Sequence, residues 1–355
     1  MKYTRARLES IGYELAPVVV TSHELEQRLA PLYEKLHLST GQLEALTGIR
    51  ERRWWTREQT LVDGATAAGE KALAQAGLAG ADIEVLIYAG VCRELFEPAT
   101  ACAVADRLKL ASGSQIYDIS NACLGMLNGI IDLANRIELG QIRAGLIVSC
   151  ESAREINDLM IEEMLSHQGM EQLSLSLATL TGGSGAAAVL MTDGTFTKSD
   201  RPQLLGAVVR ARPEYHGLCR WGVFSDAAKS ETDGHPRHDR QRMQTDSVQV
   251  LKHGVQLGKE TWEKFLTHLG WQRATVDRVI CHQVGSSHQT QVLQAFGIDQ
   301  DKDFSSYAYL GNMGTVSLPL TAALATQRGF LQTGQRVAFL GIGSGLNCMM
   351  LGWQW

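Results

Sequence analysis

The sequence lacks long apolar runs, blocks of basic residues and paired cysteine spacings. No apolar run reaches the roughly 18 residues that a membrane-spanning helix needs, so no span is predicted. The formal net charge is −5 and basic residues do not cluster, which argues against nucleic acid as a partner. The seven cysteines, an odd number, form no disulfide pattern. Residues 1–7 lack the apolar core of a signal peptide, and a reducing cytoplasm is the expected location.

What remains is the composition of a globular α/β protein. Apolar residues make up 45% of the chain and charged residues 20%. With 355 residues the chain exceeds the usual size of one core, so two domains or a fused duplicate are expected. Strand-like and helix-like patterns alternate in both halves, which indicates an α/β fold with two similar halves. Strands are expected at 84–91, 114–120, 144–149, 186–191, 276–281, 336–340 and 346–355, and helices at 22–36, 63–76, 100–108, 124–139, 247–269, 286–296 and 316–330.

Three segments depart from this alternation. Residues 47–55 are basic and aromatic and fit a surface turn with two packed tryptophans. Residues 153–180 fit an irregular helical excursion over the core. Residues 196–246 fit the least ordered part of the chain, ending in an exposed charged loop. Its His235 and His238 lack the further ligands and supporting shell of a metal site, so a solvated surface without metal is expected there.

One cysteine occupies a chemically distinctive place. Cys123 lies where an expected strand turns into an apolar helix, which Ser120 or Asn121 can cap and which Gly140 can end. A helix N-terminus carries partial positive charge, which favours a thiolate and predicts a nucleophile near neutral pH. The alternative is that Cys123 is a small hydrophobic core residue.

Two further polar residues follow buried strands. Ligand and catalytic groups of α/β sheets gather at the carboxyl ends of strands, so Cys123, His282 and Asn312 form a candidate nucleophile set. His282 alone could be a core histidine, and Asn312 alone could occupy a left-handed turn. Residues 341–347 form a glycine-rich turn that lacks the lysine of a phosphate loop.

These motifs together resemble the thiolase superfamily, in its ketoacyl synthase III branch. Within that branch the chain is most similar to the OleA family, the enzymes that join two long fatty acyl chains head to head. The resemblance implies a thiolase-like five-layer αβαβα fold of two similar halves, usually as a homodimer. The motifs are Thr-Gly-Ile-Arg-Glu-Arg at 47–52, Glu97-Pro98, Asn-Ala-Cys123, His-Gln-Val at 282–284, His288, Gly311-Asn312 and residues 340–348.

The same resemblance divides the chain into two halves. Residues 1–195 would form the half with the nucleophilic cysteine and the helical excursion near 153–180. Residues 196–355 would form the half that carries the histidine and the asparagine.

The resemblance also assigns roles. Cys123 would hold the first acyl chain as a thioester, and the backbone N–H groups of Cys123 and Ser344 would form the oxyanion hole. His282 and Asn312 would donate hydrogen bonds to the thioester oxygen of the second substrate. Glu97 would be the base that removes the α-proton, reaching in from the partner subunit, where apolar surroundings suit a base. The alternative for Glu97 is a solvated carboxylate in a turn.

The chain departs from ketoacyl synthase III at two places. The tryptophan and arginine that clamp the coenzyme adenine there fall near Gln42 and Leu46, and neither residue can play that part. In that branch an asparagine follows the sequence His-Gln-Ala, and here Gly285 takes its place, which argues against a reaction with a malonyl substrate.

The expected function is a non-decarboxylative Claisen condensation of two fatty acyl-CoA molecules. The product would be a β-keto acid or β-ketoacyl-CoA for olefin or long-chain hydrocarbon biosynthesis, with CoA thioesters as substrates and no cofactor. The main alternative is a decarboxylating 3-oxoacyl-ACP synthase III that uses malonyl-ACP. Two others are an interaction subunit without chemistry and a two-cysteine thiolase through Cys348, whose apolar strand favours a packing role instead.

Overall fold

A computed structural model describes residues 1–167, 169–196, 201–225 and 239–355. Its main feature is one nine-stranded sheet in which two groups of strands meet at a single residue pair, Arg7 with Gln203. The first group runs β1 (Arg7–Leu15), β7 (Gly185–Thr192), β6 (Ala144–Glu151), β4 (Val85–Ala89) and β5 (Gln115–Ile119). The second runs β8 (Gln203–Ala211), β13 (Asn347–Gln354), β12 (Arg336–Gly343) and β11 (Arg278–Cys281).

The two groups share one topology. Outward from the junction, β1, β7 and β6 pair antiparallel, and β4 then pairs parallel with β6. Likewise β8, β13 and β12 pair antiparallel, and β11 pairs parallel with β12. Next to β11, where β5 would have its counterpart, Asp303 makes a single parallel bridge with Val279. The two similar halves are therefore confirmed, whereas the division of the chain after residue 195 stays a prediction.

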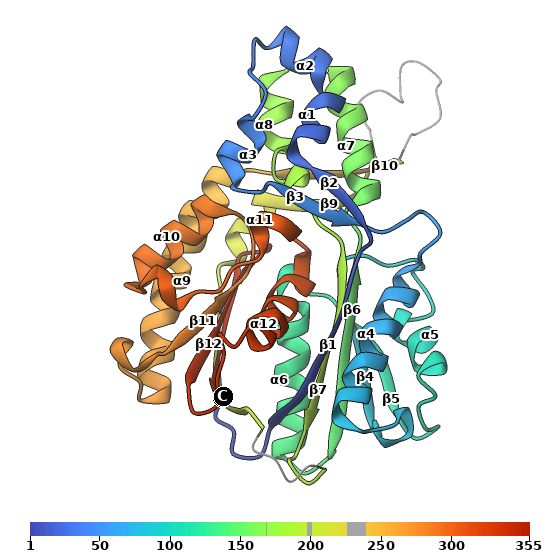
Figure 1. The fold of residues 1–355 in the computed structure, drawn as a ribbon, viewed down its shortest axis with the longest axis vertical. Coiled ribbons are helices and arrows are strands. Elements are labelled where there is room, and N and C mark those ends of the chain that lie inside the picture. The colour runs from blue at the N-terminus through green and yellow to red at the C-terminus, as the bar shows by residue number, and fades with distance from the viewer. Residues whose placement is uncertain (168, 197–200, 226–238) are drawn as a thin grey trace.

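Helices complete five layers, as Figure 1 shows. The outer face of the first group is covered by α4 (Leu61–Ala76) and α5 (Thr100–Arg107), and that of the second by α9 (Ser247–Leu269) and α10 (Ser286–Phe296). Between the groups lie α6 (Gly125–Glu138) and α12 (Ser317–Gln327), which share one core with both. The αβαβα fold expected from the sequence is confirmed.

Glycine lets the central helix approach both strand groups closely. A Cβ on Gly129 of α6 would lie 2.8 Å from Ile147 Cγ1 of β6. On the other side, a Cβ on Gly341 of β12 would lie 2.6 Å from Leu124 Cδ2, just before α6. Such distances are too short for real carbon contacts, so the close packing depends on glycine. It brings the start of α6 against the end of β12.

A cap of short elements covers one end of these layers. It contains β2 (Val18–Thr21), α1 (Ser22–Arg28), α2 (Ala30–Lys35), α3 (Gln42–Thr47), β3 (Glu51–Trp54), α7 (Arg154–His167) and α8 (Met170–Ser176). The helix expected over 22–36 is divided at Leu29, before Pro31, and the Thr21 side chain caps the start of α1. The helical excursion at 153–180 corresponds to α7 and α8.

At 47–55 the two tryptophans are packed as expected, with Trp54 4% and Trp55 3% exposed, but the expectation of a surface turn was wrong. Residues of β3 pair with β2, and the Arg52 side chain is 0% exposed. Its Nη2 donates to Ser22 Oγ at 3.0 Å and to the Leu180 carbonyl at 3.1 Å. Burial lowers the Arg52 pKa to about 10. This arginine ties the first cap helix to the chain that follows α8 because a buried guanidinium needs acceptors.

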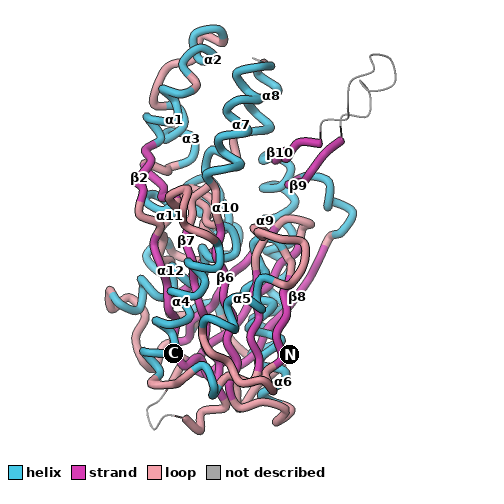
Figure 2. The backbone as a smooth tube through the Cα atoms, turned by 90° about the vertical axis from the view of Figure 1, so that its right-hand side faces the viewer, coloured by secondary structure: helices cyan, strands magenta, loops and turns pink. Residues whose placement is uncertain are grey.

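The expectation for 196–246 also needs correction. The segment contributes β8 to the main sheet and a hairpin of β9 (Cys219–Ser225) and β10 (Asp239–Thr245). The hairpin packs beside α7 and α8 in Figure 2, and Met243 N–H contacts Met160 Sδ at 3.5 Å. Strand β10 is mostly polar, so its sequence gives no alternating apolar signal. His235 and His238 lie outside the described residues.

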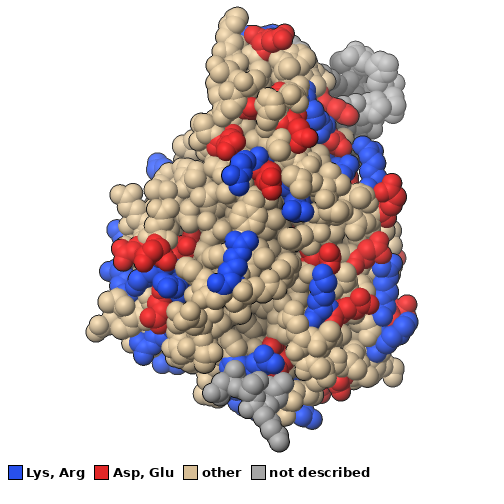
Figure 3. All heavy atoms as spheres, in the orientation of Figure 1, with Lys and Arg blue, Asp and Glu red and all other residues tan. Residues whose placement is uncertain are grey.

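Two further observations concern partners. No helix within the described ranges is long and apolar enough to cross a membrane. On the face drawn in Figure 3, the Lys and Arg residues that are shown are interspersed with Asp and Glu.

Candidate active site

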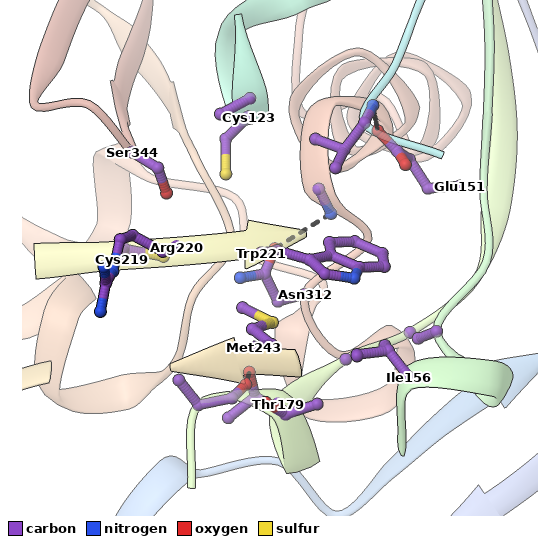
Figure 4. Close-up of a pocket in the computed structure, with 18 of the residues that line it drawn as sticks. Cys123, Glu151, Ile156, Thr179, Cys219, Arg220, Trp221, Met243, Asn312 and Ser344 are labelled. Carbon is purple, nitrogen blue, oxygen red and sulfur yellow. Dashed lines mark hydrogen bonds between the residues drawn. The ribbon is translucent and has the colours of Figure 1, made fainter. Parts of the chain in front are cut away.

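A cavity of about 410 Å³ lies beneath the cap, at the ends of the central strands. Cys123, Asn312 and Ser344 line it together, so the structure brings three of the sequence-predicted site residues into one space. Trp221 and Met243 of the β9–β10 hairpin line the same cavity (Figure 4). The cavity is thus closed by the part of the chain that the sequence indicated least clearly.

Cys123 lies in a single 3₁₀ turn, η2 (Ala122–Leu124), between β5 and α6. The residue before it, Ala122, has a φ of 43°, in the left-handed region that non-glycine residues rarely adopt. The predicted capping by Asn121 is wrong, since its amide donates to Asn128 Oδ1 and its own oxygen accepts from Asn347. The turn is therefore held by side-chain bonds to α6 and β13.

The thiol differs from the sequence expectation in its acidity. Burial raises the Cys123 pKa to about 12, and the nearby Cys219 thiol and Glu151 carboxylate act in the same direction. The predicted thiolate at a helix N-terminus is therefore wrong for this state, because desolvation outweighs the partial charge of the turn. At neutral pH Cys123 is therefore a protonated thiol in this structure.

Two backbone N–H groups point at the cysteine sulfur. The N–H groups of Ser344 and of Cys123 itself both donate toward Sγ and so favour negative charge there. Ser344 follows β12, which runs to Gly343, so the turn to β13 is shorter than the predicted 341–347. Paired N–H groups beside a nucleophile are the arrangement that binds the oxyanion of an acyl-transfer intermediate.

Asn312 does not occupy the left-handed turn considered above, and hydrogen bonds of its backbone fix its position. Its N–H donates to the Thr181 carbonyl and its own carbonyl accepts from Gly183, both at 2.9 Å. The left-handed φ of 67° belongs to Gly311. Asn312 Oδ1 accepts from the Gly314 N–H at 3.1 Å, which leaves the amide nitrogen as the donor group of the side chain.

His282 is buried and does not line the cavity. It follows β11 directly, is 4% exposed, and its backbone N–H donates to the Leu340 carbonyl at 2.9 Å. Burial and the neighbouring His288 lower its pKa to about 3, and burial lowers that of His288 to about 4. Both imidazoles are therefore neutral near pH 7, and within the described chain the Nδ1 atoms of both lack a partner.

Glu97 is not brought to the cavity by its own chain. It lies exposed in the loop between β4 and α5 and does not line the space around Cys123. The residues before it, Leu95 and Phe96, are 60% and 101% exposed. An apolar loop that projects in this way is a feature of interaction surfaces rather than of free loops.

Among the cavity residues that sequence reasoning missed are Glu151 and Cys219. Glu151 is the last residue of β6, is 4% exposed, and has its pKa raised by burial. Its signal was an acidic residue two positions after the expected strand 144–149, at the sheet end that carries the other candidates. Cys219 had no such signal, because the hairpin that presents it was not expected. No metal-binding group of histidine, cysteine and acidic residues occurs within the described residues.

Comparison with known proteins gives full-length matches. The chain is 55% identical over 357 residues to an acyl-CoA:acyl-CoA alkyltransferase of Shewanella oneidensis, covering 100% of both chains. It is 33% identical to the enzyme of the same name from Xanthomonas campestris, covering 99% of this chain and 98% of that one.

The chain belongs to the OleA family of acyl-CoA:acyl-CoA alkyltransferases.

Solved structures agree with this membership. Cerulenin-bound OleA of X. campestris matches with a TM-score of 0.92 at 33% identity, covering 100% of this chain and 98% of that chain. Another OleA structure that matches holds lauric acid and lauroyl-CoA. The profile for the C-terminal part of 3-oxoacyl-[acyl-carrier-protein] synthase III matches residues 266–355.

The solved OleA structures include substituted variants, some at a cysteine and others at a glutamate. The replaced glutamate precedes the replaced cysteine by 26 residues (143 − 117). In this chain Glu97 precedes Cys123 by the same 26 residues (123 − 97).

Proposed function

We propose that this protein condenses two fatty acyl-CoA molecules head to head without decarboxylation. The observation that carries the proposal is one cavity, in an OleA-family chain, that is lined by the Cys123 thiol, two N–H groups aimed at its sulfur, and the Asn312 amide. The product is a β-ketoacyl-CoA, or the β-keto acid after hydrolysis, on a route to long-chain hydrocarbons.

The first half-reaction transfers an acyl chain to Cys123. The sulfur bonds to the acyl carbonyl carbon, the bond from that carbon to the CoA sulfur breaks, and the thiol proton leaves with CoA. Because the Cys123 pKa is about 12, proton removal has to accompany attack. The N–H groups of Cys123 and Ser344 stabilise the tetrahedral oxyanion.

The second half-reaction forms the carbon–carbon bond. Glu97 of the partner subunit removes the α-proton of the second acyl-CoA, and neutral His282 and Asn312 donate hydrogen bonds to the enolate oxygen. The α-carbon then bonds to the thioester carbon, and the Cys123 sulfur leaves and regains a proton. Side chains and backbone supply each step, so the proposal includes no metal and no cofactor.

A homodimer is part of the proposal. Glu97 and the exposed side chains of Leu95 and Phe96 lie on one loop, and burying that loop in a second subunit would place a carboxylate in apolar surroundings. A cytoplasmic location is also proposed, and it is supported by the seven cysteines, all of which are free.

A second candidate is a decarboxylating 3-oxoacyl-ACP synthase III. Two findings favour it: the C-terminal profile match, and 28% identity to a β-ketoacyl-[acyl-carrier-protein] synthase III of Ruegeria pomeroyi over 95% of this chain. Such an enzyme makes its carbanion by losing carbon dioxide and needs no carboxylate base.

The deciding experiment supplies purified protein with lauroyl-CoA alone and identifies products by mass spectrometry. We expect a C24 β-keto product or the C23 ketone that it yields by spontaneous loss of carbon dioxide, and no stimulation by malonyl-ACP. A strict requirement for malonyl-ACP, with carbon dioxide released at each turnover, would instead establish the second candidate.

A further inference from the structure

Glu151 is a buried carboxylate whose partners are backbone N–H groups. Oε1 accepts from Val91 at 3.0 Å and Oε2 from Cys92 at 3.1 Å. No Lys or Arg forms an ion pair with it in the described chain. A buried charge without a cation is costly unless donors satisfy it. Through these bonds Glu151 holds the first residues of the loop that continues to Glu97.

The same carboxylate also holds the turn that follows Asn312. The Thr315 N–H donates to it from the 3₁₀ turn η8 (Gly314–Val316), which leads into α12. A Cβ on Gly314 would lie only 3.2 Å from Glu151 Oε1, so glycine permits this approach.

Thr315 extends this connection to the nucleophile. Its Oγ1 accepts from the Met126 N–H at 2.8 Å, in the first turn of α6 that follows Cys123. Three segments that carry proposed catalytic groups thus meet at Glu151 and Thr315: the Glu97 loop, the Asn312 turn and the start of α6.

We propose that Glu151 is a positioning residue for condensation, which couples the Asn312 turn of one subunit to the loop that delivers Glu97 to the other. The inference rests on the proposed function, because it assumes that Glu97 serves the partner's site. Glu151 has no substrate-contacting role in it. Its carboxylate fixes the positions of the Glu97 loop and the Asn312 turn. A displacement of about 1 Å in a reacting group can lower the rate about a hundredfold.

The first test is Glu151→Gln, which keeps the shape but replaces one acceptor oxygen with a donor facing a backbone N–H. We expect condensation to fall by about tenfold to hundredfold. Acylation of Cys123, measured as the burst of CoA release, should not fall, because removing the Glu151 charge that raises the Cys123 pKa acts in the opposite direction. An equal fall in both steps would overturn the proposal.

Matched variants control for general damage. Glu84→Gln alters a carboxylate that also accepts two backbone N–H groups, from Arg143 and Ala144, but at the other end of β6. We expect both half-reactions to survive it. If Glu151→Gln does not fold, Glu151→Asp keeps the charge but is too short to hold both loops, and the same split between the half-reactions is expected.

The sharper test uses mixed dimers. A Cys123→Ala subunit combined with a Glu97→Ala subunit leaves one competent site, with its base supplied by the subunit that has no nucleophile. Adding Glu151→Gln to that base-supplying subunit should lower condensation at the other site about tenfold or more. An unchanged rate would refute the positioning role.

If mixed dimers without the Glu151 change are inactive although wild-type protein condenses acyl-CoA, the action of Glu97 across the interface fails. Dimers in which both subunits carry the same substitutions then test the inference. Glu151→Gln should have no further effect in a Glu97→Ala background if it acts through that residue, and independent multiplication of the two losses would overturn it.

Discussion

The turn before α6 and the turn before α12 occupy equivalent places in the two halves, yet they carry different chemistry. Each has a 3₁₀ turn, η2 or η8, directly before a central helix. The first presents Cys123, and the second follows Asn312. The segments after β4 and β11 are likewise equivalent by topology, and they carry Glu97 and His282.

The difference between the halves is one of proton transfer. The first half holds the two groups that must gain or lose a proton in the proposed reaction, Cys123 and Glu97. The second half holds neutral donors, Asn312 and a His282 whose pKa burial has lowered to about 3. In the proposed reaction one topology thus separates groups that exchange a proton from side chains that stabilise charge, because the two halves carry different residues at equivalent positions.

The strongest test of this division removes the nucleophile. Cys123→Ala should abolish acyl-enzyme formation and lower turnover about 10⁴-fold or more, because no other group can hold the acyl chain. Intact-protein mass after incubation with acyl-CoA measures the adduct. Cys102→Ala, on exposed α5, is the control and should retain it. An adduct on Cys219 or Cys348 in the wild-type protein would contradict the assignment.

The next effect concerns the base of the first half. Glu97→Ala should acylate normally and lose about 10²- to 10⁴-fold in condensation, the range expected for a general base. The measurement separates the CoA burst from β-keto product formation. Exposed Glu94, three residues earlier on the same loop, is not a control, since it accepts the Leu61 N–H. Glu44→Ala, at an exposed position of α3, is the control instead. If Glu97→Ala loses the burst of CoA release, Glu97 does not act only in condensation and the division of roles between the halves is wrong.

A smaller loss is expected for the donor of the second half. Asn312→Ala should leave Cys123 acylation intact and slow condensation about a hundredfold, as for the loss of one donor to a developing oxyanion. Asn135→Ala, at the far end of α6, removes a bond to Tyr3 and should affect neither step. Equal rates of condensation in wild type and Asn312→Ala would remove Asn312 from the enolate site.

The smallest effect tests the neutrality of the buried histidines through stability. The pKa of His288 is lowered to about 4, so below about pH 6.5 the unfolded chain binds a proton that the folded chain does not. Folded stability should therefore fall as pH drops from about 6.5 toward 4. His288→Gln should reduce that dependence by up to about 1.4 kcal/mol per pH unit, seen in denaturant titrations.

Exposed His216→Gln is the matched control, because it removes an imidazole from the surface rather than from the interior. The same pH dependence in His288→Gln and wild type would show that this histidine is charged or solvated in the folded protein.

Local signals accounted for much of the fold. The sequence predicts the helices 247–269 and 286–296 with the bounds that the structure has. Local residues mark their ends, because Gly270 and Gly297 follow the last helical residues and adopt the left-handed conformation that ends a helix. The candidate set Cys123, His282 and Asn312 was likewise indicated by positions at strand ends or in loops after buried strands, although in the structure Asn312 follows the short helix α11 (Tyr307–Leu310). The β9–β10 hairpin was missed because β10 is mostly polar and its packing against α7 and α8 cannot be read from neighbouring residues.

The sequence by itself determined the alternation of strands and helices, the turn residues, and which polar side chains stand at the ends of strands. These depend on contacts within a few residues, and periodicity and caps record them. Tertiary structure alone decided the acidity of the Cys123 thiol, the burial of Arg52 and the bonding of Glu151. Each depends on desolvation and on donors from segments far apart in the chain, and the surroundings of a charge cannot be read from its neighbours in sequence.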